Sequence, residues 1–298
     1  MRKILILLAL LVALAGVSML GAYLITEQDR EFAFGDKVAL INIHGTISMS
    51  SDSSIFGEVR ATPENFKTAL KQAERDSSVK AILLDINCPG GSVVASGEIA
   101  DAIKNCKKPT IAWLGEIAAS GGYYVASAAD YIVADRATIT GSIGVISIFP
   151  EYSKLMEKIG VNVSVIKAGK YKDFSTGYRP MTEEEKEMLE SVVYEIYEQF
   201  INEVAENRNL SKEYVSSIAE GRVYTAKKAK ELRLVDEVGN RDFALKKAAE
   251  LGGIEGEPKI VTYKRRAFFE DFISTAFTKL GYGFAKALLE RETFYSIH

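Results

Sequence analysis

The fold of this chain is decided by residues 81–92, which read Ala81-Ile82-Leu83-Leu84-Asp85-Ile86-Asn87-Cys88-Pro89-Gly90-Gly91-Ser92. Their first half is almost entirely apolar, which is typical of a strand buried on both faces of a parallel sheet. The paired glycines then favour a tight turn, and Ser92 is a suitable N-cap for a following helix. A buried strand that leads directly into a helix predicts a βαβ unit.

The same alternation continues from Lys37 onward and predicts an α/β fold. Apolar, β-branched runs alternate with helical stretches, one of which begins after Pro63 while another can be capped by Thr182. Repeated βαβ units form right-handed crossovers and a mainly parallel sheet with helical cover. The strands we expect are 38–43, 81–86, 110–114, 131–134 and 161–166, and the helices are 64–75, 93–105, 120–128 and a long one after Thr182.

Charge and cysteine content exclude several classes of partner. The 298 residues have a formal net charge of −3, and the lysines are scattered among glutamates without a basic stripe, so we expect no nucleic acid. Cys88 and Cys106 lie at opposite ends of a predicted helix of roughly 18–20 Å, whereas bridged Cα atoms lie within about 7 Å. Neither cysteine belongs to a Cys-x-x-Cys pattern, so we expect no disulfide, no metal and no cofactor.

The N-terminus predicts a membrane anchor. Residues 4–25 are uncharged and, at about 1.5 Å per residue, are long enough for a hydrocarbon layer of about 30 Å. A cleaved signal peptide is the alternative, because Ala13 and Ala15 form a possible processing site, yet the apolar run continues well past it. Because Arg2 and Lys3 keep the N-terminus cytoplasmic, we expect a single-pass protein of the cell membrane with an extracytoplasmic main domain.

The chain therefore divides into an anchor at 1–25, a tether at 26–36, a main domain at 37–262 and a C-terminal segment at 263–298. The last segment has aromatic and aliphatic residues at helical spacing among few charges, which predicts an amphipathic helix. Three roles remain open for this helix: it lies on the membrane, packs on a neighbouring subunit, or completes the fold.

Three glycine-rich turns follow predicted strands, at 87–92, 118–122 and 140–145. Backbone N–H groups and helix N-termini gather at the carboxyl ends of parallel strands, where ligands usually bind. The second turn contains Ser120, in the run Ala118-Ala119-Ser120-Gly121-Gly122. Each turn alone predicts no more than a connection between a strand and a helix.

A nucleophilic serine in this position needs a base that is not histidine. The chain has only two histidines, His44 at a predicted strand end and His298 at the C-terminus. Because the base must come within about 3 Å of the hydroxyl, we look for a lysine, and Lys170 and Lys172 are the candidates.

Five ordered blocks resemble the serine–lysine peptidase family S49, which includes signal peptide peptidase A and belongs to the Clp-protease-like and crotonase-like folds. Any one block is weak evidence, but their order is specific and extends over most of the chain. The blocks are 85–91, 119–125, 140–145, 168–173 and 221–226 continuing through 234–236.

The resemblance implies a role for each candidate site residue. Ser120 would be the nucleophile and Lys172 the general base, with the hydroxyl of Ser142 supporting the lysine amine. The N–H groups of Gly91 and Gly121 would form the oxyanion hole. These five residues are the expected catalytic site.

The choice of lysine is not settled by the residues themselves. Lys170 would share a face with Lys172 in an extended segment, and the preference for Lys172 comes from the family pattern. A lysine acts as a base only when neutral, so it must avoid carboxylates such as that of the adjacent Asp173. Cys88 stands where the family more often has serine or threonine, and no histidine nearby in sequence would activate it.

The resemblance implies a membrane-anchored serine endopeptidase that degrades cleaved signal peptides and other apolar peptides through an acyl-enzyme. It also implies a ring-like homo-oligomer. One alternative is a Clp-like membrane protease that cuts specific membrane-protein segments, and another is a non-catalytic crotonase-like scaffold. A coenzyme A hydratase is disfavoured because its catalytic carboxylates are not evident in these loops.

Overall fold

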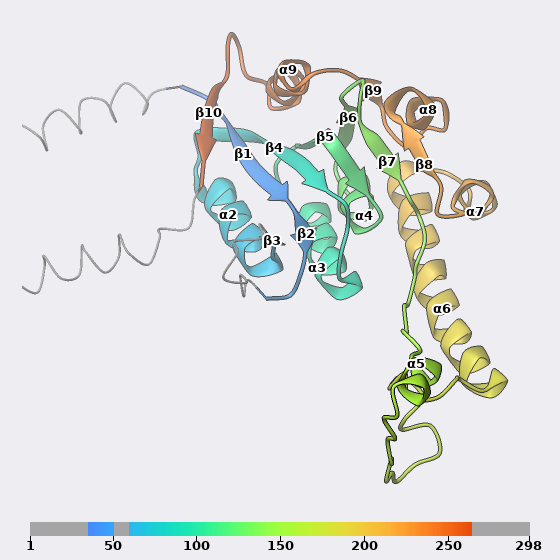
Figure 1. Ribbon diagram of the computed structural model, residues 1–298. Helices are drawn as coiled ribbons and strands as arrows, with labels where there is room; N and C mark the ends of the chain where they lie inside the picture. The colour runs from blue at the N-terminus through green and yellow to red at the C-terminus, as the bar shows by residue number, and fades with distance from the viewer. Residues whose placement is uncertain (1–34, 51–59, 264–298) are drawn as a thin grey trace, which may run out of the picture. The chain divides into compact units, whose positions relative to one another are not determined.

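The computed structural model describes residues 35–50 and 60–263 (Figure 1). The predicted anchor, most of the predicted tether, and the predicted C-terminal segment from residue 264 onward lie outside these ranges. Within the two described ranges, no helix combines the length and the apolar character needed to cross a membrane.

Strands and helices alternate along the described chain, and the strands form a mainly parallel sheet. The sheet order is β10-β1-β4-β5-β6-β9, and the neighbours from β1 to β9 pair in parallel. The predicted α/β class is therefore confirmed. The strands are β1 (Lys37–His44), β2 (Thr46–Ile47), β3 (Arg60–Ala61), β4 (Val79–Cys88), β5 (Thr110–Ala119), β6 (Tyr131–Ala134), β7 (Ile139–Gly141), β8 (Val223–Thr225), β9 (Glu237–Val238) and β10 (Lys259–Thr262).

Helices cover both faces of the sheet. Helix α9 contacts β1, β4 and β5, whereas α2 and α4 contact the strands from the opposite side (Figure 1). The helices are α2 (Pro63–Arg75), α3 (Val93–Lys104), α4 (Gly121–Ser127), α5 (Ser153–Lys158), α6 (Glu183–Arg208), α7 (Lys212–Ile218), α8 (Ala226–Glu231) and α9 (Arg241–Leu251).

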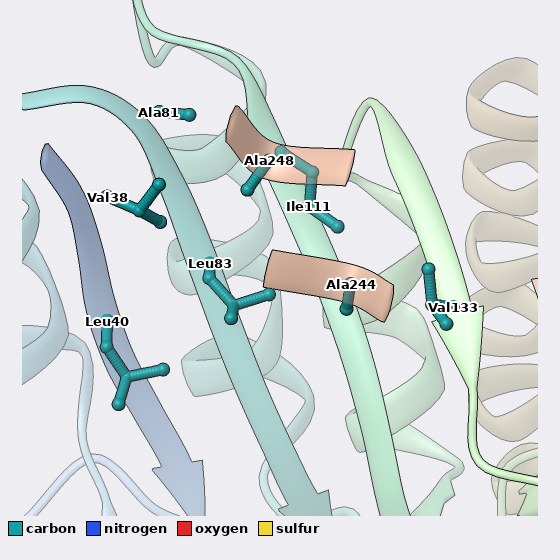
Figure 2. Packing of buried hydrophobic residues seen from close by; sticks show 8 residues of the cluster. All are labelled: Val38, Leu40, Ala81, Leu83, Ile111, Val133, Ala244 and Ala248. Atoms are coloured by element: carbon teal, nitrogen blue, oxygen red, sulfur yellow. The ribbon is translucent and has the colours of Figure 1, made fainter. Parts of the chain in front are cut away.

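The apolar run that predicted β4 is buried on both of its faces. Ala81 and Leu83 belong to the cluster that packs against Ala244 and Ala248 of α9 (Figure 2). The residues between and after them, such as Ile82, point to the other face and are also fully buried. Successive side chains alternate across a strand, so an unbroken apolar run is what a central parallel strand requires.

The predicted helix caps are present at the helices that frame the site. Ser92 accepts a hydrogen bond from the N–H of Ala95 at 3.4 Å and so caps α3. Thr182 caps α6 in a capping box: its hydroxyl accepts from the N–H of Glu185 at 3.2 Å, and the Glu185 carboxylate accepts from the N–H of Thr182 at 2.9 Å.

The prediction of a buried strand at 161–166 is wrong. This segment has no strand, and Ile166 is fully exposed, at 101% of its reference area. The chain leaves the sheet after β7, and β9 pairs with β6 at Val133 and Ala134. Alternating β-branched residues indicate an extended chain, but they do not provide a neighbouring strand, and no strand among the described residues pairs with 161–166.

Candidate active site

The Gly90–Gly91 turn between β4 and α3 lies directly against Ser120. Gly90 has a φ of 118°, and a Cβ on it would stand 2.9 Å from the Cβ of Ser120. A Cβ on Gly91 would stand 2.0 Å from the carbonyl oxygen of Ile47 in β2. Both positions therefore require glycine, because any side chain would collide with its neighbour.

Ser120 occupies a strained turn between β5 and α4. Its φ of 51° and ψ of −124° are rare for a residue with a side chain. Two hydrogen bonds hold this conformation: the Ser120 N–H donates to the oxygen of Gly141 at 2.9 Å, and its carbonyl accepts from the N–H of Tyr124 at 2.9 Å. A half-buried serine on a sharp turn from strand to helix is well placed to act as a nucleophile.

Two backbone N–H groups beside Ser120 are free to bind an anion. A Cβ on Gly121 would stand 3.2 Å from the nitrogen of Gly91, so these two backbone positions are neighbours. Neither N–H donates to a backbone carbonyl of the described residues. Two neighbouring amides without a backbone partner, next to a serine, are the elements of which an oxyanion hole is made.

Ser142 is brought to the same place by the pairing of β7 with β5. Ala119 pairs with Gly141, and the N–H of Ser120 donates to the oxygen of Gly141, so Ser142 lies one residue beyond the partner of Ser120. Ser142 also has a φ of 51°, and its N–H donates to the oxygen of Arg222 at 2.7 Å. The structure thus gathers four of the five predicted site residues in one place.

A pocket opens beside Ser120 between α3, α4 and α6. Its walls are mostly apolar, and the ring of Tyr124 packs edge-on against that of Phe200 with centroids 5.0 Å apart. A pocket of this kind accepts an apolar side chain. Its lining residues are Gly91, Val93, Ser96, Ser120, Gly121, Tyr124, Ile196, Gln199 and Phe200.

The fifth predicted residue, Lys172, does not line this pocket. It lies in residues 145–182, which we call the arm and which run from β7 away from the sheet before α6 returns (Figure 1). The arm contains α5, which has no buried residue, and two of its isoleucines, Ile146 and Ile148, are 82% and 77% exposed. Neither a lysine nor a histidine is among the residues that line the pocket.

The arm distinguishes the two candidate lysines by their partners. The Lys170 ammonium donates to Glu184 at 2.5 Å and stands 4.9 Å from the centre of the Tyr171 ring. The bond to Glu184 raises the pKa of Lys170, which holds this amine in its charged form. The Lys172 side chain is exposed, and no ion pair is present at its ammonium within the described residues. Of the two candidates, Lys172 is therefore the one whose amine is not held by a carboxylate of the described residues.

The other nucleophilic groups near Ser120 are held inert. Cys88 is completely buried, and burial raises the pKa of its thiol, which opposes thiolate formation. Its sulfur accepts from the N–H of Gly90 at 3.3 Å, so the cysteine supports the glycine turn. Burial also raises the pKa of Tyr124 to about 12, which keeps its hydroxyl protonated at neutral pH.

Ser96 is a polar residue of the pocket that the sequence did not single out. Its hydroxyl is buried and has no hydrogen-bond partner in the described structure, although the residue lines the pocket. Buried hydroxyl groups are normally paired. The only sequence signal is its spacing of four residues from Ser92, which puts both on one face of α3.

Two family models match the sequence of this chain. Residues 102–255 match the model of Peptidase family S49, and residues 46–142 match that of Clp protease. The fold is shared with the 1510-N membrane-bound stomatin-specific protease, at a TM-score of 0.53 and 16% identity over 78% of this chain and 100% of that one.

Several relatives share much more sequence. The Putative protease MJ0651 of Methanocaldococcus jannaschii is 39% identical over 97% of this chain and 95% of its own length. The Putative signal peptide peptidase SppA of Enterococcus faecium is 37% identical over 76% of this chain and 67% of its own. Protease 4 of Haemophilus influenzae is 34% identical over 82% of this chain, which spans only 40% of that protein. The chain described here belongs to peptidase family S49.

Proposed function

We propose that this protein is a serine endopeptidase in which Ser120 is the nucleophile and Lys172 the general base. The observation that carries the proposal is the strained Ser120 turn between the unpaired N–H groups of Gly91 and Gly121. A hydroxyl beside two such donors can attack a peptide carbonyl whose oxygen becomes negative in the transition state.

The reaction follows from these groups. The Ser120 oxygen bonds to the carbonyl carbon of the substrate while the neutral Lys172 amine takes the serine proton. The C–N bond then breaks, Lys172 returns the proton to the leaving amine, and an acyl-enzyme remains. Lys172 next takes a proton from water, whose oxygen attacks the ester carbon; the ester C–O bond then breaks, Lys172 returns that proton to the Ser120 oxygen, and the acid product leaves. Ser142, one residue beyond Gly141, is the proposed support for the lysine amine.

Lys172 is proposed to come from a second copy of the chain. In one copy it lies on the arm, and the pocket at Ser120 is lined without it. The arm also exposes several isoleucine side chains, and the surfaces of soluble monomeric proteins rarely expose apolar side chains in a group. A symmetric oligomer that covers the arm would bury them and carry Lys172 to a neighbour's serine.

The proposed substrates are apolar peptides, including cleaved signal peptides, that bind extended with an apolar side chain in the pocket. Val93, Tyr124, Ile196 and Phe200 provide its apolar walls. The predicted anchor at 1–25 would hold the enzyme at the cell membrane, where such apolar peptides accumulate. The catalytic domain would lie outside the cytoplasm. A substrate profile distinguishes this from a protease that cuts one specific membrane protein.

The test is the hydrolysis of an apolar fluorogenic peptide by the full chain in detergent. We expect Ser120→Ala and Lys172→Ala each to lower kcat by about 10³-fold or more, because members of a catalytic unit fail together. Lys170→Ala is the matched control from the same loop and should retain activity within about threefold, since this lysine is an exposed ion-pair partner. Activity that survives in Ser120→Ala, or that is lost only in Lys170→Ala, would refute the assignment.

A further inference from the structure

Asp173, the residue next to Lys172, belongs to a hydrogen-bonded cluster of charged side chains that joins the arm to α6. Two nitrogens of the Arg179 guanidinium donate to the Asp173 carboxylate, at 3.0 and 2.7 Å, and two donate to the Glu185 carboxylate, at 2.8 and 2.6 Å. The Lys167 ammonium also donates to Asp173, to the carboxylate oxygen that accepts from Arg179 at 2.7 Å. One arginine therefore joins the loop that carries Lys172 to the first turn of α6.

In the arm and at the start of α6, carboxylate side chains are buried and isoleucine side chains are exposed, which is the opposite of the usual pattern in a globular domain. The side chains of Asp173 and Glu185 are only 8% and 3% exposed, while the isoleucines of the arm face solvent. Two nearly buried carboxylates are costly unless they are paired, and Arg179 pairs both in forked geometry. Arg179 lowers the pKa of Glu185 to about 2, and together with Lys167 it holds the pKa of Asp173 below its ordinary range.

The pairing has a consequence for Lys172. An ionised carboxylate adjacent in sequence would favour the charged form of the lysine, which cannot accept a proton. Both oxygens of Asp173 are already bound by Arg179, and Glu184 is bound by Lys170 and Tyr171. The charged or titratable groups on the loop that carries Lys172 and on the first turn of α6 are Lys167, Lys170, Tyr171, Asp173, Arg179, Glu183, Glu184, Glu185 and Lys186.

We propose that Arg179 is a positioning residue of the peptidase: it sequesters the Asp173 carboxylate from Lys172 and ties the Lys172 loop to α6. The inference rests on the proposed function, because it assigns Arg179 a role only if Lys172 is the base. Arg179 is not among the residues that line the pocket, and its proposed effect on the reaction passes through Lys172.

The experiment measures kcat/KM of the full chain against pH with the apolar fluorogenic peptide. In Arg179→Gln the Asp173 oxygen that Lys167 does not bind loses its partner. A free carboxylate favours the charged form of Lys172, which is inactive as a base, so the acid limb of the profile should move to higher pH by about one unit. Adding Asp173→Asn to that variant should return the limb to its original position, although the loop remains untied. Glu185→Gln should lower kcat without moving the limb, because Arg179 still binds Asp173.

Two further variants keep the test decisive. Lys186→Gln also removes one positive charge at the start of α6, where Lys186 pairs with the exposed Glu183 at 2.5 Å, and it should leave the profile unchanged. Arg179→Lys retains the charge but cannot form both forks, so kcat should fall by about tenfold while the limb stays in place. Circular dichroism checks that each variant is folded.

An equal loss at every pH in Arg179→Gln that Asp173→Asn does not correct would mean a structural role only, and would overturn the inference. Wild-type kcat in Arg179→Lys would overturn it as well. These results are separable from failure of the proposed function, which would appear as activity retained in Lys172→Ala whatever the Arg179 variants do.

Discussion

At the scale of single residues, the site is organised around the contact between Gly90 and Ser120. The φ of Gly90 lies in the region that favours glycine, and its missing side chain leaves room for the serine. The sequence predicted that glycines would stand beside the serine. It could not predict the positive φ of Ser120, because a serine before a helix usually adopts an ordinary cap conformation.

Replacing Gly90 should damage catalysis at this contact. In Gly90→Ala the new Cβ would press on the Ser120 Cβ at 2.9 Å, so the turn must shift, and we expect kcat to fall by about 10²-fold. The control is Gly97→Ala in the middle of α3, where no atom lies within 4 Å of the new Cβ. That variant should keep its activity and gain about 0.5–1 kcal/mol of stability. Full activity in Gly90→Ala would show that the turn is not held as tightly as the geometry indicates.

The partner of the serine was harder to choose from sequence than the serine itself. Lys170 and Lys172 are equivalent by spacing, and only three-dimensional contacts separate them: Glu184 occupies Lys170, while the exposed Lys172 shows no such pair in the described ranges. The neighbour Asp173 was a concern in the sequence because it could hold a lysine charged. Its capture by Arg179, six residues away, depends on a loop conformation that no local pattern reveals.

At the scale of elements, the sequence predicted the helices with clear caps and the strands with strongly apolar runs, but it wrongly predicted a strand at 161–166. The strand 131–134 and the starts of α3 and α6 occur as predicted, because local caps and a buried apolar run determine them. Strand β5 continues to Ala119, five residues beyond the predicted end at Leu114, and so leads directly into Ser120. The segment 161–166 failed because a strand needs a partner as well as a pattern.

Two serines at the packing of α3 on α4 provide a test of stability that is measured by unfolding and not by activity. Ser96→Ala removes a buried hydroxyl without a partner, so the free energy of unfolding should rise by about 1 kcal/mol. Ser127→Ala in α4 is the matched control: its hydroxyl donates to the oxygen of Tyr124 at 2.7 Å and accepts from Asn207 at 3.2 Å. This variant should lose about 1 kcal/mol.

Thermal unfolding of the two serine variants gives the comparison. For a domain of this size a change of 1 kcal/mol moves Tm by about 2–4 °C, and the two shifts should have opposite signs. A fall in Tm for Ser96→Ala equal to that of Ser127→Ala would mean that Ser96 has a partner inside the protein.

At the scale of the whole molecule, the pocket beside Ser120 and the side chain of Lys172 lie in different parts of the described chain. The sheet, α3, α4 and α6 build the pocket, whereas the arm carries Lys172 and exposes Ile146, Ile148 and Ile166. Apolar surface of this kind favours association, so the same exposure that contradicts the predicted strand at 161–166 supports the proposed oligomer. No sequence pattern distinguishes a segment buried in its own fold from one buried against another copy.

Mixing two inactive variants tests the shared Ser120–Lys172 site most directly. Full-length Ser120→Ala and Lys172→Ala are each assayed alone and then after dissociation and reassembly together in equal amounts. Each alone should be inactive, and the mixture should recover up to about a quarter of the wild-type activity, the statistical fraction of sites that pair an intact serine with an intact lysine. Activity in either variant alone would contradict the dyad, and a mixture that stays inactive although mixed oligomers form would contradict a site shared between copies.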